Sequence, residues 1–146
     1  MKMKYCPIVL FVLLATACSR EKAPAPAPED IYNSEGLTVI TSSFNSSRQT
    51  MSTLYGNAAA LKAAGDSIHQ PGEDYRLVTW KQQSHPLWFG SNKNGAVTTV
   101  ERITITVAAD GKPGIDYELV QGKPADLPGR KERAKFILAQ RPSVFP

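Results

Sequence analysis

The chain has 146 residues and a formal net charge of +4, from 17 Lys and Arg against 13 Asp and Glu. No basic tract with interleaved aromatic residues occurs, so this charge does not indicate a nucleic acid partner. Both cysteines, Cys6 and Cys18, lie near the start, which excludes a disulfide, a zinc site or a cysteine nucleophile from the remaining residues.

The first residues have the pattern of a bacterial lipoprotein signal. Two lysines precede an apolar run from Tyr5 to Ala17, which is shorter than the roughly 20 residues of a membrane-spanning helix. The run ends in L-A-T-A-C, which resembles the segment that lipoprotein signal peptidase cuts before the cysteine. We therefore predict a signal peptide over residues 1–17 and a diacylglycerol group on Cys18. An ordinary signal peptide, cut after Ala17 to leave a free thiol, is the alternative.

The predicted lipid also indicates a location. Ser19 follows Cys18, and in lipoproteins of Gram-negative bacteria a residue other than aspartate there implies export to the outer membrane. A further acyl chain, such as palmitate, makes this anchor firm because each buried methylene contributes about 0.8 kcal/mol. Residues 18–30 contain A-P-A-P-A-P, which favours an extended polyproline II tether. We expect the folded domain, residues 31–146, to face the periplasm while acylated Cys18 lies in outer-membrane lipid.

The first part of this domain is expected to be two strands and a helix. Alternation of apolar and polar residues predicts strands over 37–44 and 48–55. A short alanine-rich helix follows, which Asn57 is expected to cap and Gly65 to end.

Three further strands are predicted after this helix. They span residues 75–82, 97–107 and 115–119, all rich in β-branched or aromatic residues. Asn94-Gly95 is expected to form a hairpin turn, and residues 109–112 form another around Asp-Gly.

The chain is expected to close with a helix over residues 130–140. Its apolar residues recur on one side at helical spacing: Ala134, Ile137 and Leu138. Its basic residues either face solvent or contact anionic lipid or polysaccharide: Arg130, Lys131, Arg133, Lys135 and, just beyond, Arg141. The predicted fold class is therefore α+β, an antiparallel β-sheet domain with one short inserted helix and a C-terminal helix.

Residues that could carry chemistry are few. The chain contains no G-x-S-x-G motif and no glycine-rich phosphate loop. His69 and His85 are the two candidate metal ligands, but neither belongs to a metal-binding spacing, and we expect both to be ordinary loop histidines. We predict no catalytic residue and favour a binding function over an enzyme.

The segment T-W-K-Q-Q-S-H-P-L-W-F-G, residues 79–90, supports two hypotheses. In one, its side chains form a pocket for a flat ligand such as a haem: Trp80, Lys81, His85, Trp88 and Phe89. In the other, which we favour, Trp80 is a core residue of a strand, and Trp88 and Phe89 close the sheet after a turn.

Several segments resemble the cytochrome P-460 domain and its relative cytochrome c′-β. They are V-I-T-S-S-F, T-M-S-T-L-Y-G-N, P-G-E-D-Y-R-L-V-T-W-K-Q-Q and W-F-G, and the likeness runs from about Thr38 to the C-terminus. The resemblance implies a periplasmic, antiparallel, β-rich and usually dimeric domain. Members bind c-type haem through C-x-x-C-H near the C-terminus, and some oxidise hydroxylamine or handle nitric oxide.

This chain departs from that pattern at the attachment motif. Its last cysteine is Cys18 and its last histidine is His85, so covalent c-type haem is excluded. We therefore expect an outer-membrane lipoprotein with a cytochrome P-460-like domain that binds a ligand or a partner without covalent haem. Two alternatives remain open. One is a redox protein that holds haem non-covalently through His69 or His85, and the other is a structural module of the envelope with no small ligand.

Overall fold

The computed structural model of the protein describes residues 32–85, 88–123 and 129–143. The predicted signal peptide (1–17), the lipidation site Cys18 and the tether (18–30) lie outside the described residues. Among the residues that are described, no helix is both long and apolar enough to cross a membrane.

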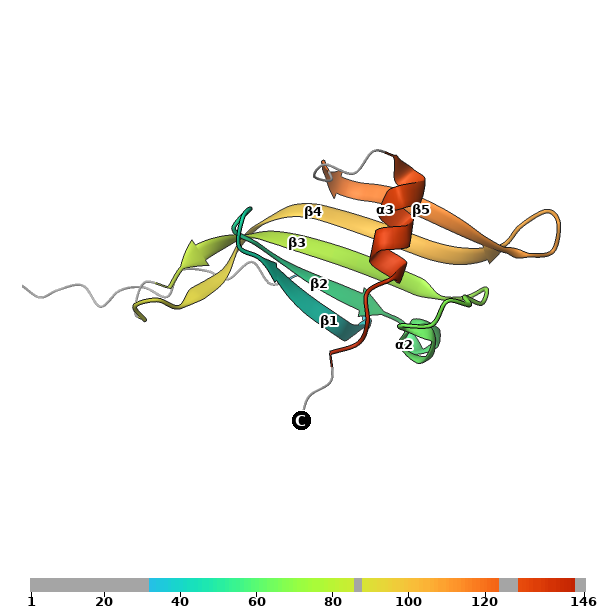
Figure 1. The fold of residues 1–146 in the computed structure, drawn as a ribbon, viewed down its shortest axis with the longest axis horizontal. Helices are drawn as coiled ribbons and strands as arrows, with labels where there is room; N and C mark the ends of the chain where they lie inside the picture. Colours follow the sequence, from blue (N-terminus) through green and yellow to red (C-terminus); the bar gives the residue numbers. More distant parts are fainter. Residues whose placement is uncertain (1–31, 86–87, 124–128, 144–146) are drawn as a thin grey trace, which may run out of the picture.

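The described chain forms one antiparallel sheet and two short helices (Figure 1). The sheet has five strands in the order β1-β2-β3-β4-β5, so every strand pairs with its neighbour in sequence. In chain order the elements are β1 (Thr38–Asn45), β2 (Thr50–Gly56), α2 (Ala58–Ala63), β3 (Asp74–Ser84), β4 (Asn92–Val107), β5 (Pro113–Gly122) and α3 (Arg130–Leu138). The predicted antiparallel sheet, inserted helix and C-terminal helix are confirmed, in a fold dominated by the sheet.

One predicted turn is wrong. Asn94 and Gly95 lie inside β4, where Asn94 is opposite Gln82 of β3. Gly95 is buried because the side chain of Gln83 packs against it, and a Cβ there would lie 2.7 Å from Gln83 Cγ. The glycine therefore serves a close approach between two strands, and the connection between β3 and β4 falls before Asn92.

The main core lies between the sheet and α3, which crosses the strands on one face (Figure 1). Its buried side chains come from all but the last strand and from both helices: Ile40, Leu54, Ala60, Tyr75, Leu77, Ile103, Ile105, Ala134, Ile137 and Leu138. The predicted apolar side of the last helix is thus confirmed. Burial of each large apolar side chain contributes about 1.5–3 kcal/mol relative to exposure.

A smaller cluster occupies the other face of the sheet. Val78, Trp80 and Val100 are buried there, with Tyr32 and Tyr55 packed against them. Side chains along β3 alternate between the two faces, as expected for a strand.

The start of α2 depends on two neighbouring residues. Asn57 is the N-cap, and its side-chain oxygen accepts a hydrogen bond from Ala60 N at 2.9 Å, as predicted. A Cβ on Gly56 would lie 2.6 Å from Ile40 Cδ1 and 2.8 Å from the Ala60 Cβ, so only glycine lets the helix pack this closely. Gly65, with a φ of 89°, lies just beyond the end of the helix and confirms the predicted stop.

The chain after α3 returns to the first strand. Ser143 N donates to Ile40 O at 3.1 Å, and the hydroxyls of Ser143 and Thr41 are 2.8 Å apart. The described C-terminal residues therefore run beside β1 (Figure 1).

Candidate functional site

A hollow of about 380 Å³ lies on the α3 side of the sheet, where the apolar core gives way to polar side chains. We call it the α3 hollow. It is bounded by the first four strands, the β1–β2 turn, Lys123 after β5, and Arg133 and Phe136 of α3. Its volume is at the small end of the range for ligand pockets, roughly 300–1,000 Å³.

The walls of the α3 hollow are rich in hydroxyl groups. They come from Ser43, Thr50, Ser52, Thr79, Thr98 and Thr99. Thr50 and Ser52 share this face of β2 because residues two apart on a strand point the same way. Ser52 Oγ and Thr79 Oγ1 are 2.9 Å apart, so the hydroxyls of neighbouring strands bond to one another. The hollow therefore offers donors and acceptors on fixed strands.

A buried ion pair fixes one wall of the hollow. Glu101 of β4 is fully buried and accepts hydrogen bonds from Arg133 Nε at 2.6 Å and Arg133 Nη2 at 2.5 Å. Tyr117 of β5 donates its hydroxyl to the same carboxylate at 2.7 Å. The guanidinium carbon of Arg133 also lies 5.1 Å from the centre of the Phe136 ring. These contacts hold Arg133 in one orientation at the edge of the hollow.

This carboxylate changes the titration of both partners. The hydrogen bonds to Glu101 raise the pKa of Arg133. Burial raises the pKa of Tyr117, and the hydrogen bond to Glu101 raises it further. Arg133 is therefore charged and Tyr117 neutral at neutral pH.

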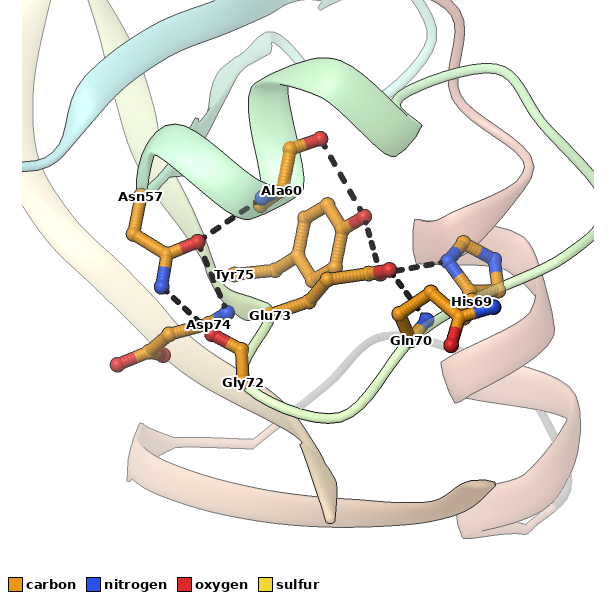
Figure 2. A network of polar contacts seen from close by, with 8 residues as sticks. All are labelled: Asn57, Ala60, His69, Gln70, Gly72, Glu73, Asp74 and Tyr75. Carbon is orange, nitrogen blue, oxygen red and sulfur yellow. Dashed lines mark hydrogen bonds and ion pairs between the residues drawn. The ribbon is translucent and has the colours of Figure 1, made fainter. Parts of the chain in front are cut away.

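A second buried carboxylate lies at the start of β3 (Figure 2). Glu73 is 1% exposed, and its Oε1 accepts a hydrogen bond from Gln70 N at 2.5 Å. Its Oε2 accepts one from the Tyr75 hydroxyl at 2.8 Å and lies 2.8 Å from His69 Nδ1. Burial raises the pKa of Tyr75, and the hydrogen bond to Glu73 adds to this effect.

Asn57 links this cluster to α2 (Figure 2). Besides capping the helix, its Oδ1 accepts from Asp74 N at 3.3 Å and its Nδ2 donates to Gly72 O at 2.8 Å. The polar network therefore joins the helix, the loop that follows it and the start of β3. We interpret this network as structural and call it the Glu73 cluster.

The Nδ1 atom of His69 is within hydrogen-bond distance of Glu73 Oε2, and the imidazole ring borders a second hollow of about 470 Å³. A carboxylate-held imidazole is a common arrangement for metal ligands. The walls here also carry the charged side chains of Asp66, Lys135 and Arg141. Within the described residues, three or more His, Cys, Asp or Glu side chains are nowhere grouped as a metal ion would need.

The residues of the predicted flat-ligand pocket are spread along the β3–β4 hairpin. Trp80 is 2% exposed on the sheet face opposite the main core, which confirms its role in packing. Lys81 is exposed, and His85 N bonds to Ser91 O at the end of β3. Neither of the two hollows described above is lined by any residue of that pocket, which stays a prediction.

The predicted packing of Trp88 and Phe89 is wrong. Trp88 is 68% exposed and Phe89 is fully exposed. From Gln83 onward β3 pairs with β4 alone, so this end of the hairpin extends past β1 and β2 (Figure 1). Within the described parts of the chain, no further strand lies beside this end of the hairpin for the two aromatic rings to cover.

Sequence reasoning also missed the residues of the α3 hollow. Arg133 was placed among the basic residues that face solvent or lipid, yet it is largely buried against Glu101. One signal was available, because Arg133 lies four residues before Ile137, on the apolar side of the helix. A second was the run of Thr and Ser at alternate positions of β2, on the face that also carries Leu54.

No protein-family model matches the chain, and no curated protein matches it significantly. The likeness to cytochrome P-460, with the haem chemistry and dimer that it implies, therefore stays a prediction.

Proposed function

We propose that the protein is an outer-membrane lipoprotein whose periplasmic domain binds a small ligand in the α3 hollow. In this proposal the domain is an α+β, cytochrome P-460-like scaffold without covalent haem, anchored through acylated Cys18. The observation that carries the proposal is the hydroxyl-lined hollow itself, which lies where the apolar core would otherwise continue. Each hydroxyl can both donate and accept a hydrogen bond, so a polar ligand can bond to them in place of water.

The chemistry of the hollow favours binding over catalysis. Its described walls carry hydroxyls, amides and cations but no histidine or carboxylate that could act as a general base. The carboxylate that pairs with Arg133, Glu101, already accepts three hydrogen bonds. Thr79 and Ser52 bond to each other and lack an activating partner among the described residues.

The proposal can be tested with the full chain in detergent micelles. We would screen neutral, anionic and cationic small molecules by thermal shift, and then map each hit from its effects on backbone amide resonances. Hits should perturb Thr79 and Thr99 and should weaken in Thr79→Val, which keeps the shape but removes the hydroxyl. The matched control is Thr104→Val, on the opposite face of β4. Hits that map elsewhere, or no hits at all, would contradict the proposal.

One observation favours partner binding as a second candidate function. Trp88 and Phe89 are exposed together at the end of the hairpin, and exposed aromatic residues commonly mark contact sites. If the domain forms the dimer that the resemblance implies, or docks on another envelope protein, replacing both with serine should abolish the association. Light scattering of the detergent-solubilised chain would reveal a dimer, and an unchanged mass in the variant would exclude this surface.

The haem alternative makes its own prediction. Haem titration of the full chain should give a saturable Soret band that is lost in His69→Ala or His85→Ala. A band that survives both substitutions would exclude His69 and His85 as ligands of the haem iron.

A further inference from the structure

Strand β5 leaves one edge of the sheet open. The strand at the other edge, β1, has the C-terminal residues beside it, where Ser143 N donates to Ile40 O. Among the described residues, no segment pairs with the outer side of β5 (Figure 1). An open edge presents N–H and C=O groups that can pair with the backbone of another chain.

The unpaired backbone groups of this edge follow from the hydrogen bonds of β4. The N–H and C=O of Ile105 both bond, at 2.9 Å, to the segment that leads into β3. Because alternate residues of an antiparallel strand bond to opposite neighbours, Ile115, which lies opposite Ile105, directs its N–H and C=O away from β4. Tyr117, two residues along, does the same. The adjoining hydrogen bond from Ala108 N to Lys112 O, at 2.8 Å, has the phase that this alternation requires.

The side chains of these residues lie on the α3 side of the sheet. The Tyr117 hydroxyl donates to Glu101, the residue that pairs with Arg133 of α3. Ile115 and Leu119 share this face of β5 and are 52% and 38% exposed. A strand added to the edge would therefore lay alternate side chains beside exposed apolar residues on the α3 side.

A hollow of about 470 Å³ lies between β5 and α3. We call it the β5 groove. Both elements line it, with Pro113, Ile115, Asp116 and Tyr117 from β5 and Arg130, Lys131, Ala134 and Lys135 from α3. None of these residues borders the α3 hollow, so the two sites are separate.

The α3 side of the β5 groove is positively charged. Its three basic residues are exposed and form no ion pair within the described residues: Arg130, Lys131 and Lys135. Asp116 is the single acidic residue among the described lining residues, and its side chain alternates to the other face of β5. Glu132 of α3 lies beside Gly129 and does not line the groove. The groove is therefore complementary to acidic side chains on the α3 side of an added strand.

A second copy of the chain is a poor match for this edge. If two β5 strands paired antiparallel about a two-fold axis, Asp116 and Glu118 of both copies would gather on one face of the joined sheet. The basic residues of both α3 helices would gather on the other face. Like charges on neighbouring strands are destabilising, so the charges favour a different partner.

We propose that the open edge of β5 binds an extended acidic segment of a partner protein as an added strand, with the acidic side chains on the basic residues of the β5 groove. Backbone hydrogen bonds to Ile115 and Tyr117 supply affinity, and the groove supplies specificity. This interaction surface is independent of the ligand site proposed in the α3 hollow.

Three synthetic peptides test this inference with the full chain in neutral detergent. The first, T-E-V-E-V-E-T, places its glutamates on one face when it is extended. The second has lysine in place of each glutamate. The third keeps the glutamates but carries N-methyl groups on the central glutamate and the valine after it, which removes an N–H donor from each edge of the peptide.

Fluorescence anisotropy of the labelled peptides gives their affinities. We expect the first peptide to bind at least about tenfold tighter than the lysine peptide, because several exposed ion pairs replace repulsions. The N-methylated peptide should also bind at least about tenfold more weakly, since it loses backbone hydrogen bonds but keeps its charge. Added salt should weaken binding of the first peptide.

Hydrogen exchange of the backbone amides locates the bound peptide. Without peptide, the amides of Ile115 and Tyr117 should exchange faster than those of Asp116 and Glu118, which the alternation directs toward β4. The glutamate peptide should slow the exchange of Ile115 and Tyr117 and leave the amides of β1 unchanged.

Charge-removing variants test the groove. The double variant Lys131→Gln with Lys135→Gln should weaken the glutamate peptide about fivefold, because each exposed ion pair contributes little. The matched control is Lys62→Gln with Lys81→Gln, which removes two exposed lysines from α2 and β3. All four positions are exposed, so circular dichroism should show that both double variants fold.

Several results would overturn the inference. It is wrong if the glutamate peptide does not bind, or if the lysine or N-methylated peptide binds equally well. It is also wrong if the loss of Lys131 and Lys135 leaves the affinity unchanged, or if binding does not slow the exchange of Ile115 and Tyr117. Slow exchange of these two amides without peptide, together with a dimeric mass from light scattering, would assign the edge to a second copy instead.

Discussion

Arg133 of α3 and Glu101 of β4 face each other through two hydrogen bonds, from Nε to Oε1 and from Nη2 to Oε2. The Glu101 side chain is fully buried, and Tyr117 supplies a third donor. The pair attaches the last helix to β4, and Arg133 lines the α3 hollow. Because the charges are out of water, each depends on the other.

Removing Arg133 alone should therefore be costly. We expect Arg133→Met to lower the free energy of unfolding by about 3–5 kcal/mol, since it leaves the Glu101 charge buried and unpaired. The double variant Glu101→Leu with Arg133→Met should recover most of this loss. Urea denaturation measures both, and Lys131→Met, an exposed position of the same helix, is the control. A loss below about 1 kcal/mol in Arg133→Met would mean that the pair behaves as a surface ion pair.

Removing the charge of Glu73 should lower the free energy of unfolding. In Glu73→Gln an amide replaces one carboxylate oxygen, and one of the donors from His69, Gln70 or Tyr75 loses its acceptor. We expect a loss of about 1–3 kcal/mol, and about 0.5–1.5 kcal/mol for Tyr75→Phe, which removes a single donor. Asp116→Asn, an exposed carboxylate of β5, should change little. Equal stability of Glu73→Gln and the wild type would contradict a structural role for the Glu73 cluster.

Stability should fall at alkaline pH. Burial and a carboxylate partner raise the pKa of both Tyr75 and Tyr117, so the folded state favours the neutral phenols. This stabilisation is complete below the ordinary tyrosine pKa of about 10 and is lost as the pH rises from there toward the raised values of the folded state. Unfolding free energies measured across this range should decline less steeply in Tyr75→Phe and Tyr117→Phe. Parallel declines in all three proteins would contradict this assignment.

The two tryptophans should report different environments. Trp88→Phe leaves only the buried Trp80, whose emission should lie at short wavelength and resist quenching by acrylamide. Trp80→Phe leaves the exposed Trp88, which should emit at longer wavelength and be quenched readily. Similar quenching in both variants would show that the hairpin end is covered in solution.

The strands could be predicted because apolar and polar residues alternate along each of them, as expected for a strand with one buried face. In β4, for example, Ile103 and Ile105 share a face with Glu101, and the helix caps followed from Asn57 and Gly65. This alternation places Glu101 on the buried face of β4. The alternation does not identify Arg133 as the partner of Glu101, because the two residues lie 32 positions apart and meet only once the helix has docked.

The α3 hollow and the hairpin end were missed for different reasons. Serine and threonine are common on the wet faces of strands, so Thr50 and Ser52 become wall residues only when the position of α3 is known. At the hairpin, Asn94-Gly95 is a strong local turn signal, but the pairing of β3 with β4 continues through it. The continuous pairing of these two long strands therefore overrides the turn preference of Asn94-Gly95.

The return of the chain to β1 bears on the order in which the domain can assemble. Each pair of neighbouring strands is consecutive, so the sheet can grow as a series of local hairpins. The contact between Thr41 and Ser143 closes a span of 102 residues, and α3 has no surface to pack on until the strands beneath it exist. We therefore expect docking of the last residues to be the final step of folding. A nascent chain that stops before Arg130 would carry Leu54, Leu77 and Ile103 uncovered, in the form most prone to aggregate.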